Sequence, residues 1–114
     1  MHEVGIVESV LELLCQHVAA QGARRVERVV LRIGGLAAVD PEALRFAFEA
    51  VTPGTIAQGA ALDIESVPTV VFCSRCAREF EGDHSFIYTC PTCGDLCGEI
   101  RRGRELELSR IEMT

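Results

Sequence analysis

Two pairs of cysteines constrain the fold of this chain more than any other feature. Each pair has two residues between its members: Cys73 with Cys76, and Cys90 with Cys93. Two thiolates at this spacing bind one metal ion from a single tight turn, and two such turns complete a tetrahedral shell with metal–sulfur bonds of about 2.3 Å. Zinc suits four thiolates best, and rubredoxin-like iron is the main competitor. Because the shell leaves no open position for a substrate, we expect a structural site.

Three other side chains share the chemistry of these pairs. Cys97 follows Cys93 by four residues; we expect a spare thiol, and exchange with one of the ligands is the alternative. His84 lies between the pairs and is expected to be a solvated loop histidine, with contact to the metal site as the alternative. Cys15 falls on the apolar stripe of a predicted helix, where a cysteine behaves as a small buried hydrophobe.

The composition favours a cytoplasmic globular protein. Hydrophobic residues make up 48% of the chain, which is enough for a core, and no apolar run is long enough to cross a bilayer. The N-terminus lacks the features of a signal peptide, so in a reducing compartment the six cysteines are expected to be metal ligands and spare thiols. The net charge of −6 opposes nucleic-acid binding. We therefore expect no membrane insertion and no nucleic-acid partner.

Apolar residues at helical spacing predict two helices. The first runs from about residue 4 to about residue 21 and ends at Gly22. The second begins after Asp40-Pro41-Glu42, which supplies an N-cap, a first-turn proline and an acidic first turn. Its apolar stripe contains Leu44, Ala47, Phe48 and Val51, and Thr52-Pro53-Gly54 ends it.

Alternating apolar residues predict three strands, at residues 28–33, 61–67 and 105–108. Between the second and third strands the composition shifts, because this stretch holds five of the six cysteines and few aliphatic residues. Such a stretch cannot build a core of its own, so a metal must hold it together. The last strand is then expected to return to the sheet formed by the first two.

The predicted fold class is α+β. It consists of a small mixed three-stranded sheet with two helices, plus an inserted four-cysteine zinc-ribbon-like module. Residues 1–69 and 104–114 are expected to form the α+β domain, and residues 70–103 the inserted zinc-binding domain.

The first three residues, Met1-His2-Glu3, offer a second candidate metal site. A frayed start before a helix is the simpler interpretation. The alternative is chelation, because the Met1 amine, the His2 amide nitrogen and the His2 imidazole Nδ1 are joined through short chelate rings and fit one plane around a divalent ion. Square-planar nitrogen and oxygen donors indicate nickel(II) or copper(II).

The start of a helix suits such a site, because its first N–H groups have no intrahelical acceptor. The His2 amide can therefore lose its proton to a metal without breaking a helix hydrogen bond, and the Glu3 amide or carboxylate is a natural fourth donor. A cation is otherwise unfavourable at this positive end of the helix, so anionic donors are needed. Asp40 is a further possible oxygen ligand, in competition with its expected role as an N-cap.

Together these residues resemble the hydrogenase-maturation nickel chaperones of the HypA/HybF family. The resemblance covers essentially the whole chain in order. It is carried by Met1-His2-Glu3, the helix that follows, Arg32-Ile33-Gly34, Asp40-Pro41-Glu42, Phe48-Glu49 and the two cysteine pairs. Two Cys-x-x-Cys motifs alone are generic, and the opening Met-His-Glu makes the combination specific.

The resemblance implies a nickel-binding α+β domain with a zinc domain inserted before its last strand. It implies His2 as the principal Ni(II) ligand, with Met1 and Glu3 contributing, and structural Zn(II) on the paired cysteines. Nickel would be bound transiently and delivered to the large-subunit precursor of a [NiFe]-hydrogenase, with a HypB-type GTPase as partner. A monomer or a weak homodimer without catalytic activity is expected.

Two other classes of protein compete with the nickel chaperone. The first is a zinc-ribbon interaction module without nickel function, whose basic clusters at residues 24–28 and 101–104 would dock a protein or a nucleic acid. Nucleic-acid binding would require an affinity that falls steeply with salt. The second is a metal-dependent enzyme, but the sequence lacks a Ser-His-Asp set, a phosphate loop and a zinc with an open position.

Overall fold

The chain divides into two compact units, which are described separately. The computed structural model describes residues 2–82 and 87–114, so Met1 and His84 lie outside the described residues. The first unit comprises Met1–Arg32, Ala38–Glu65 and Glu107–Thr114, and the second comprises Ile33–Ala37 and Ser66–Leu106.

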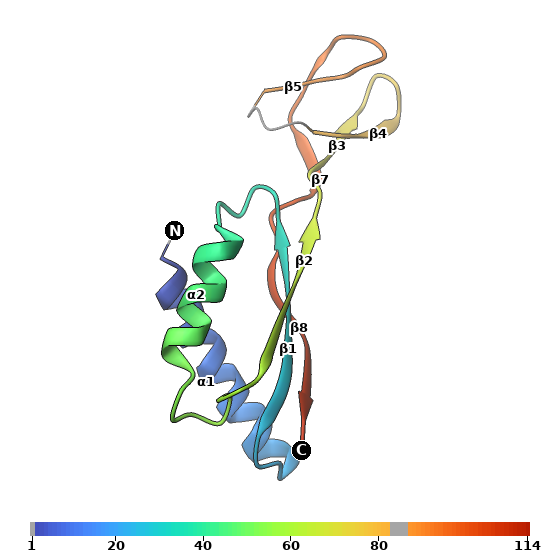
Figure 1. Cartoon of the computed structure of the whole chain (residues 1–114). Coiled ribbons are helices and arrows are strands. Elements are labelled where there is room, and N and C mark those ends of the chain that lie inside the picture. Colours follow the sequence, from blue (N-terminus) through green and yellow to red (C-terminus); the bar gives the residue numbers. More distant parts are fainter. Residues whose placement is uncertain (1, 83–86) are drawn as a thin grey trace. The chain divides into compact units, whose positions relative to one another are not determined.

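A mixed three-stranded sheet organises the first unit. Its strands are β2 (Ala61–Val67), β1 (Val26–Gly34) and β8 (Leu106–Met113), in that order across the sheet. The arrows of β1 and β2 point the same way in Figure 1, and that of β8 points the opposite way. The last strand therefore returns to the sheet of the first two, as the sequence predicts. It extends well beyond the predicted residues 105–108.

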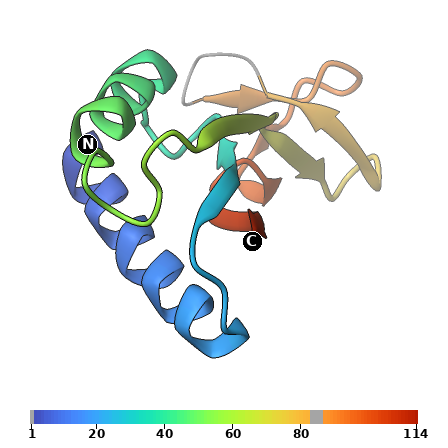
Figure 2. The same cartoon turned by 60° about the horizontal axis from the view of Figure 1, so that its bottom comes forward.

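Two helices, α1 (Glu3–Gln21) and α2 (Pro41–Val51), lie on the same side of this sheet (Figures 1 and 2). Both pack through the stripes that the spacing of their apolar residues predicts. The buried residues are Val7, Val10, Leu14 and Val18 in α1, and Leu44, Ala47 and Phe48 in α2. At the end of α1, Gly22 takes the left-handed conformation with a φ of 64° and donates its N–H to the carbonyl of Ala19. No helix in the described part is long and apolar enough to span a membrane.

The prediction that Cys15 is buried was wrong. Its side chain is exposed on α1, although Leu14 beside it is fully buried. Neighbouring positions on a helix are separated by about 100°, and the buried stripe of α1 follows spacings of three and four residues through Leu14. Cys15 lies just outside this stripe, because the packed face is narrower than the apolar face in the sequence.

The other face of the sheet carries an array of charges around two arginines of the central strand. Arg28 Nη1 lies 2.6 Å from Asp63 Oδ2, and Arg28 Nε lies 3.7 Å from Glu112 Oε1. Arg32 makes the corresponding pairs with Glu65 and Glu107, each at 3.8 Å. All of these side chains are partly exposed, so each pair by itself contributes little to stability. Together they keep this face polar.

Short antiparallel strands build the second unit. One sheet has the order β4 (Arg78–Glu81), β3 (Val70–Cys73) and β7 (Glu99–Arg102), and a separate ribbon pairs β5 (Tyr88–Thr89) with β6 (Leu96–Cys97). Its buried hydrophobic residues among those described are Ile33, Val67, Val70, Val71, Cys73, Tyr88 and Cys90. Two of these are cysteines of the paired motifs, which agrees with the expectation of a scarce aliphatic core.

Within the second unit, the backbone from Gly34, the last residue of β1, to Leu36 approaches another backbone segment closely. A Cβ at Gly34 would lie 2.0 Å from the carbonyl oxygen of Gly103, which no side chain could tolerate. The Leu36 N–H donates to that same oxygen at 2.7 Å, and the Gly34 N–H donates to the carbonyl of Glu105 at 2.8 Å. Gly34 is therefore required by close packing of two backbones.

Replacing Leu14 by alanine is expected to lower the free energy of unfolding by about 2–5 kcal/mol, because the Leu14 side chain on the packed face of α1 is fully buried. Leu13→Ala is the matched control, since Leu13 is the adjacent residue and is 41% exposed. Its cost should stay below about 1 kcal/mol. Urea denaturation followed by circular dichroism measures both, and equal losses would contradict the burial pattern of α1.

Candidate metal centre

Each cysteine pair sits where a strand passes into a tight turn. Cys73 ends β3, and Cys76 lies in the turn before β4. Cys90 follows β5, and Cys93 lies in the turn before β6. Because the strands fix the first cysteine and the turn brings back the second, each pair presents both sulfur atoms to the same side.

The two turns share a left-handed residue directly after the second cysteine. Gly94 has a φ of 78° and donates its N–H to the carbonyl of Cys90 at 2.9 Å. Ala77 occupies the corresponding position in the first turn, with a φ of 53°. An alanine in this conformation costs about 1 kcal/mol or more, which the rest of the turn has to offset.

The four sulfur atoms are arranged as a metal ion requires. All four lie within 4.8 Å of one another. Cys73 Sγ is 3.6 Å from Cys93 Sγ, and Cys90 Sγ is 3.9 Å from Cys76 Sγ. A tetrahedron with metal–sulfur bonds of about 2.3 Å has sulfur–sulfur edges of about 3.8 Å. The cluster therefore fits zinc, and among the described residues no other group of cysteine, histidine and acidic side chains meets this criterion.

Backbone N–H groups favour the thiolate of the first cysteine in each pair. The Cys76 nitrogen lies 3.4 Å from Cys73 Sγ, and its N–H lowers the pKa of Cys73. The N–H groups of Cys93 and Thr92 likewise lower the pKa of Cys90, to about 6. The sequence did not point to Thr92, because a backbone donor has no side-chain pattern by which to recognise it.

The second cysteine of each pair resists ionisation. The Cys93 thiol and burial raise the pKa of Cys76 to about 12, and the other thiols add to this. The Asp95 N–H lowers the pKa of Cys93, but burial and the neighbouring thiols outweigh it, so that this pKa is raised. A divalent cation is what allows all four groups to be thiolates at once.

Cys97 lies beside the cluster but outside the group of four. Its Sγ donates to the carbonyl of Asp95 at 3.5 Å. Burial and the adjacent Cys73 thiol raise the pKa of Cys97 to about 11, so it is protonated at neutral pH. The structure thus brings the four predicted ligands together and leaves the fifth cysteine next to them, outside the group.

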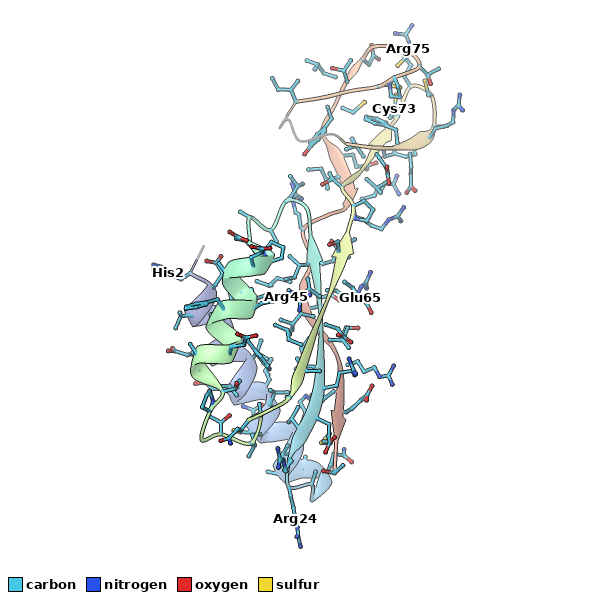
Figure 3. All side chains as sticks on the ribbon, in the orientation of Figure 1. His2, Arg24, Arg45, Glu65, Cys73 and Arg75 are labelled. Atoms are coloured by element: carbon cyan, nitrogen blue, oxygen red, sulfur yellow. The ribbon has the colours of Figure 1, made fainter. Side chains whose placement is uncertain are left out.

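His2 occupies the N-cap of α1 with a free side chain. Its φ of −80° and ψ of 100° are extended, and its imidazole makes no capping hydrogen bond. Its carbonyl accepts the N–H of Ile6 at 3.2 Å, so the helix begins directly after it. Figure 3 shows the exposed side chain projecting away from the ribbon. Glu3, the first helical residue, is partly buried.

Asp40 takes the predicted role of N-cap at α2. Its Oδ1 accepts the N–H of Glu42 at 3.0 Å and that of Ala43 at 3.4 Å. This oxygen is therefore already used, and only Oδ2 is left for a metal. Both helices begin at the upper end of the first unit in Figure 1.

Cys73→Ser is expected to abolish stoichiometric zinc binding and to unfold the second unit, because three thiolates leave the shell incomplete. Cys97→Ser is the matched control and should keep one zinc per chain. Metal analysis of the purified variants and amide hydrogen exchange of residues 66–106 measure the two effects. Loss of zinc from both variants would place Cys97 among the ligands.

Zinc affinity is expected to rise with pH around neutrality. Since the pKa values of Cys76 and Cys93 are raised, both thiols hold protons that the metal must displace, and protons expel the metal as the pH falls. Displacement of about two protons changes the apparent affinity by about 100-fold per pH unit. Chelator competition at two pH values one unit apart measures this. A change of less than about tenfold would contradict the proposed protonation.

Comparisons with known proteins agree along the whole length of the chain. The family described as "Hydrogenase/urease nickel incorporation, metallochaperone, hypA" matches residues 1–113. "Hydrogenase maturation factor HypA" of Dechloromonas aromatica is 43% identical over 113 residues, which is 99% of both chains. The protein of the same description from Chloroflexus aurantiacus is 43% identical over 112 residues, which is 98% of both chains.

Two solved structures of HypA proteins are similar to this chain over nearly its whole length. The solution structure of the Ni metallochaperone HypA from Helicobacter pylori has a TM-score of 0.67 at 30% identity, covering 99% of this chain and 97% of the other. A second solution structure of a HypA protein has a TM-score of 0.73, also at 30% identity, covering 100% and 97%. The chain therefore belongs to the HypA family of nickel-incorporation metallochaperones, which are metal carriers and not enzymes.

Proposed function

We propose that this chain binds Ni(II) at its amino terminus and delivers it during maturation of a [NiFe]-hydrogenase. The assignment of nickel as the metal and of hydrogenase maturation as the process rests on family membership. The observation that carries the location of the site is the exposed His2 side chain, which stands at the N-cap of α1 without a capping hydrogen bond. A histidine committed to the fold would be buried or hydrogen-bonded, whereas this one is available to a metal.

The donors that we propose are the Met1 amine, the His2 amide nitrogen and the His2 imidazole, with Glu3 completing the set. The first N–H groups of a helix lack intrahelical acceptors, so deprotonating them costs no helix hydrogen bond. Anionic donors also offset the positive end of the helix, which otherwise repels a cation. Binding releases protons and weakens in acid. An exposed site of this kind can pass its ion to another protein.

We propose that the four paired cysteines hold Zn(II) as a structural ion. The fit of the sulfur cluster to a tetrahedron supports this assignment. Residues 70–103 would then be the zinc-binding domain, and residues 1–69 with 104–114 the nickel-binding domain. Nickel and zinc are kept apart by donor type, because zinc suits thiolates and a planar set of nitrogen donors suits nickel.

The proposed partners follow from the same role. A carrier that delivers nickel for hydrogenase maturation requires a recipient, which we propose to be the large-subunit precursor. A HypB-type GTPase would act with it in the cytoplasm, and the carrier would be a monomer or a weak homodimer. The relatives' description as hydrogenase maturation factors supports partners within hydrogenase maturation.

Nickel calorimetry on the untagged, zinc-loaded protein tests the proposal. The parent should bind one Ni(II) with micromolar or tighter affinity, at about −8 kcal/mol or better. His2→Ala should abolish binding, because it removes the imidazole donor.

Asp40→Asn is the matched control, since asparagine also caps helices and only the carboxylate charge is lost. We expect this variant to bind nickel like the parent. Parental nickel affinity in His2→Ala would instead refute an amino-terminal site.

A further inference from the structure

A hollow at the surface of the second unit leads to one of the four paired cysteines. It has a volume of about 330 Å³, and its lining includes Cys73 and Cys97. All four paired cysteines belong to the described residues, and only Cys73 of them lines this hollow. Cys73 is otherwise buried, with an exposed fraction of 1%. A small polar molecule that enters the hollow therefore meets Cys73 before any other ligand of the cluster.

The Cys97 thiol lies directly against the Cys73 sulfur. The two side chains form a hydrogen bond with each other, whereas Cys90 and Cys93 influence Cys97 as charges at longer range. The β5–β6 ribbon accounts for this placement, because Cys97 is paired with the buried Tyr88 and cross-strand partners share one face. Cys97 is thus a thiol in contact with one ligand of the shell and outside the shell itself.

The segment that carries Cys97 has room for a small movement. Strand β6 consists of only two residues, and Leu96 is 76% exposed. Gly98 follows, and a Cβ at that position would meet no atom within 4 Å. Sulfur atoms in hydrogen-bond contact need to approach by about 2 Å to form a disulfide bond of about 2.05 Å. The surroundings of Cys97 therefore permit a bond to Cys73.

The two thiols suit successive steps of an oxidation. As a metal ligand Cys73 is a thiolate, which is the form that attacks a peroxide. Its attack on one oxygen of hydrogen peroxide breaks the O–O bond, and it yields a sulfenic acid on Cys73 and a hydroxide ion. The Cys97 sulfur then bonds to the oxidised sulfur, and the hydroxyl group leaves with the Cys97 proton as water. One thiolate, one thiol and one peroxide thus give one disulfide, one water and one hydroxide.

We propose that Cys73 and Cys97 form a redox-sensitive pair, in which a small peroxide oxidises Cys73 and Cys97 captures it as a disulfide. The disulfide removes one of the four donors, and three thiolates leave the shell incomplete, so zinc is released. Reduction by a thiol restores the site, because the capture prevents further oxidation of Cys73 to a sulfinic acid. This inference rests on the zinc site proposed above and adds its regulation by oxidants.

Peroxide treatment of the reduced, zinc-loaded, full-length chain tests the inference. Free thiols are blocked with N-ethylmaleimide after a brief exposure to hydrogen peroxide. Peptide mass spectrometry then identifies the disulfides, and a chromogenic chelator measures the released zinc. In the parent, the first disulfide should join Cys73 to Cys97, and zinc should be released in the same proportion. Dithiothreitol and fresh zinc should then restore one zinc per chain.

Two serine variants separate the role of Cys97 from that of free thiols in general. Cys97→Ser keeps all four ligands and should begin with one zinc per chain. Peroxide should oxidise its Cys73 to a sulfinic acid, so dithiothreitol should fail to restore its zinc binding. Cys15→Ser is the matched control, because Cys15 is a free cysteine exposed on α1. This variant should behave like the parent in every measurement.

A first disulfide between two of the four paired cysteines would overturn the inference. Full recovery of zinc in Cys97→Ser would do the same, as would zinc that peroxide does not release from the parent. If the parent lost its zinc without a disulfide between Cys73 and Cys97, the zinc assignment would stand and only the redox pair would fail. If the reduced parent held no zinc at the start, the zinc assignment would fail and the proposed release with it.

Discussion

Repulsion among four closely spaced sulfur atoms governs the second unit. Cys73 and Cys93 lie 3.6 Å apart, and backbone N–H groups favour the thiolate only at the first cysteine of each pair. A shared divalent cation removes the repulsion and fixes both turns at once. The buried aliphatic side chains of this unit are few, so its short strands have little else to define their arrangement. The metal thus takes the place of a hydrophobic core.

Local patterns predicted those elements whose causes are local. The α2 helix begins where Asp40-Pro41-Glu42 places it, since an N-cap and a first-turn proline act on their own neighbours. The length of β8 was missed, because Ser109-Arg110-Ile111-Glu112 does not alternate and its strand conformation comes from pairing with β1. At Gly34 the sequence indicates that the strand ends. It cannot indicate why glycine is needed there, because the reason is the close approach of the Gly103 backbone, which is distant in the sequence.

The candidate sites divide in the same way. Covalent spacing predicted the four cysteines that the structure brings together. The donors at His2 follow from bonds along the chain in the same way and stay a prediction. The sequence could not indicate the N–H donors of Cys93 and Thr92, the left-handed Ala77 or the ψ of His2, which are properties of the folded backbone. The exposure of Cys15 was likewise set by the width of a packed face, which tertiary contacts decide.

The position of β8 also sets an order of events during protein synthesis. The central strand β1 pairs with β2 on one edge and with β8 on the other, and all of residues 68–105 are translated before β8. One edge of β1 therefore stays open while the chain grows, and all four paired cysteines leave the ribosome before that edge can close. A nascent chain therefore presents all four paired cysteines while its sheet is still incomplete, so the sulfur cluster can assemble before the last strand pairs.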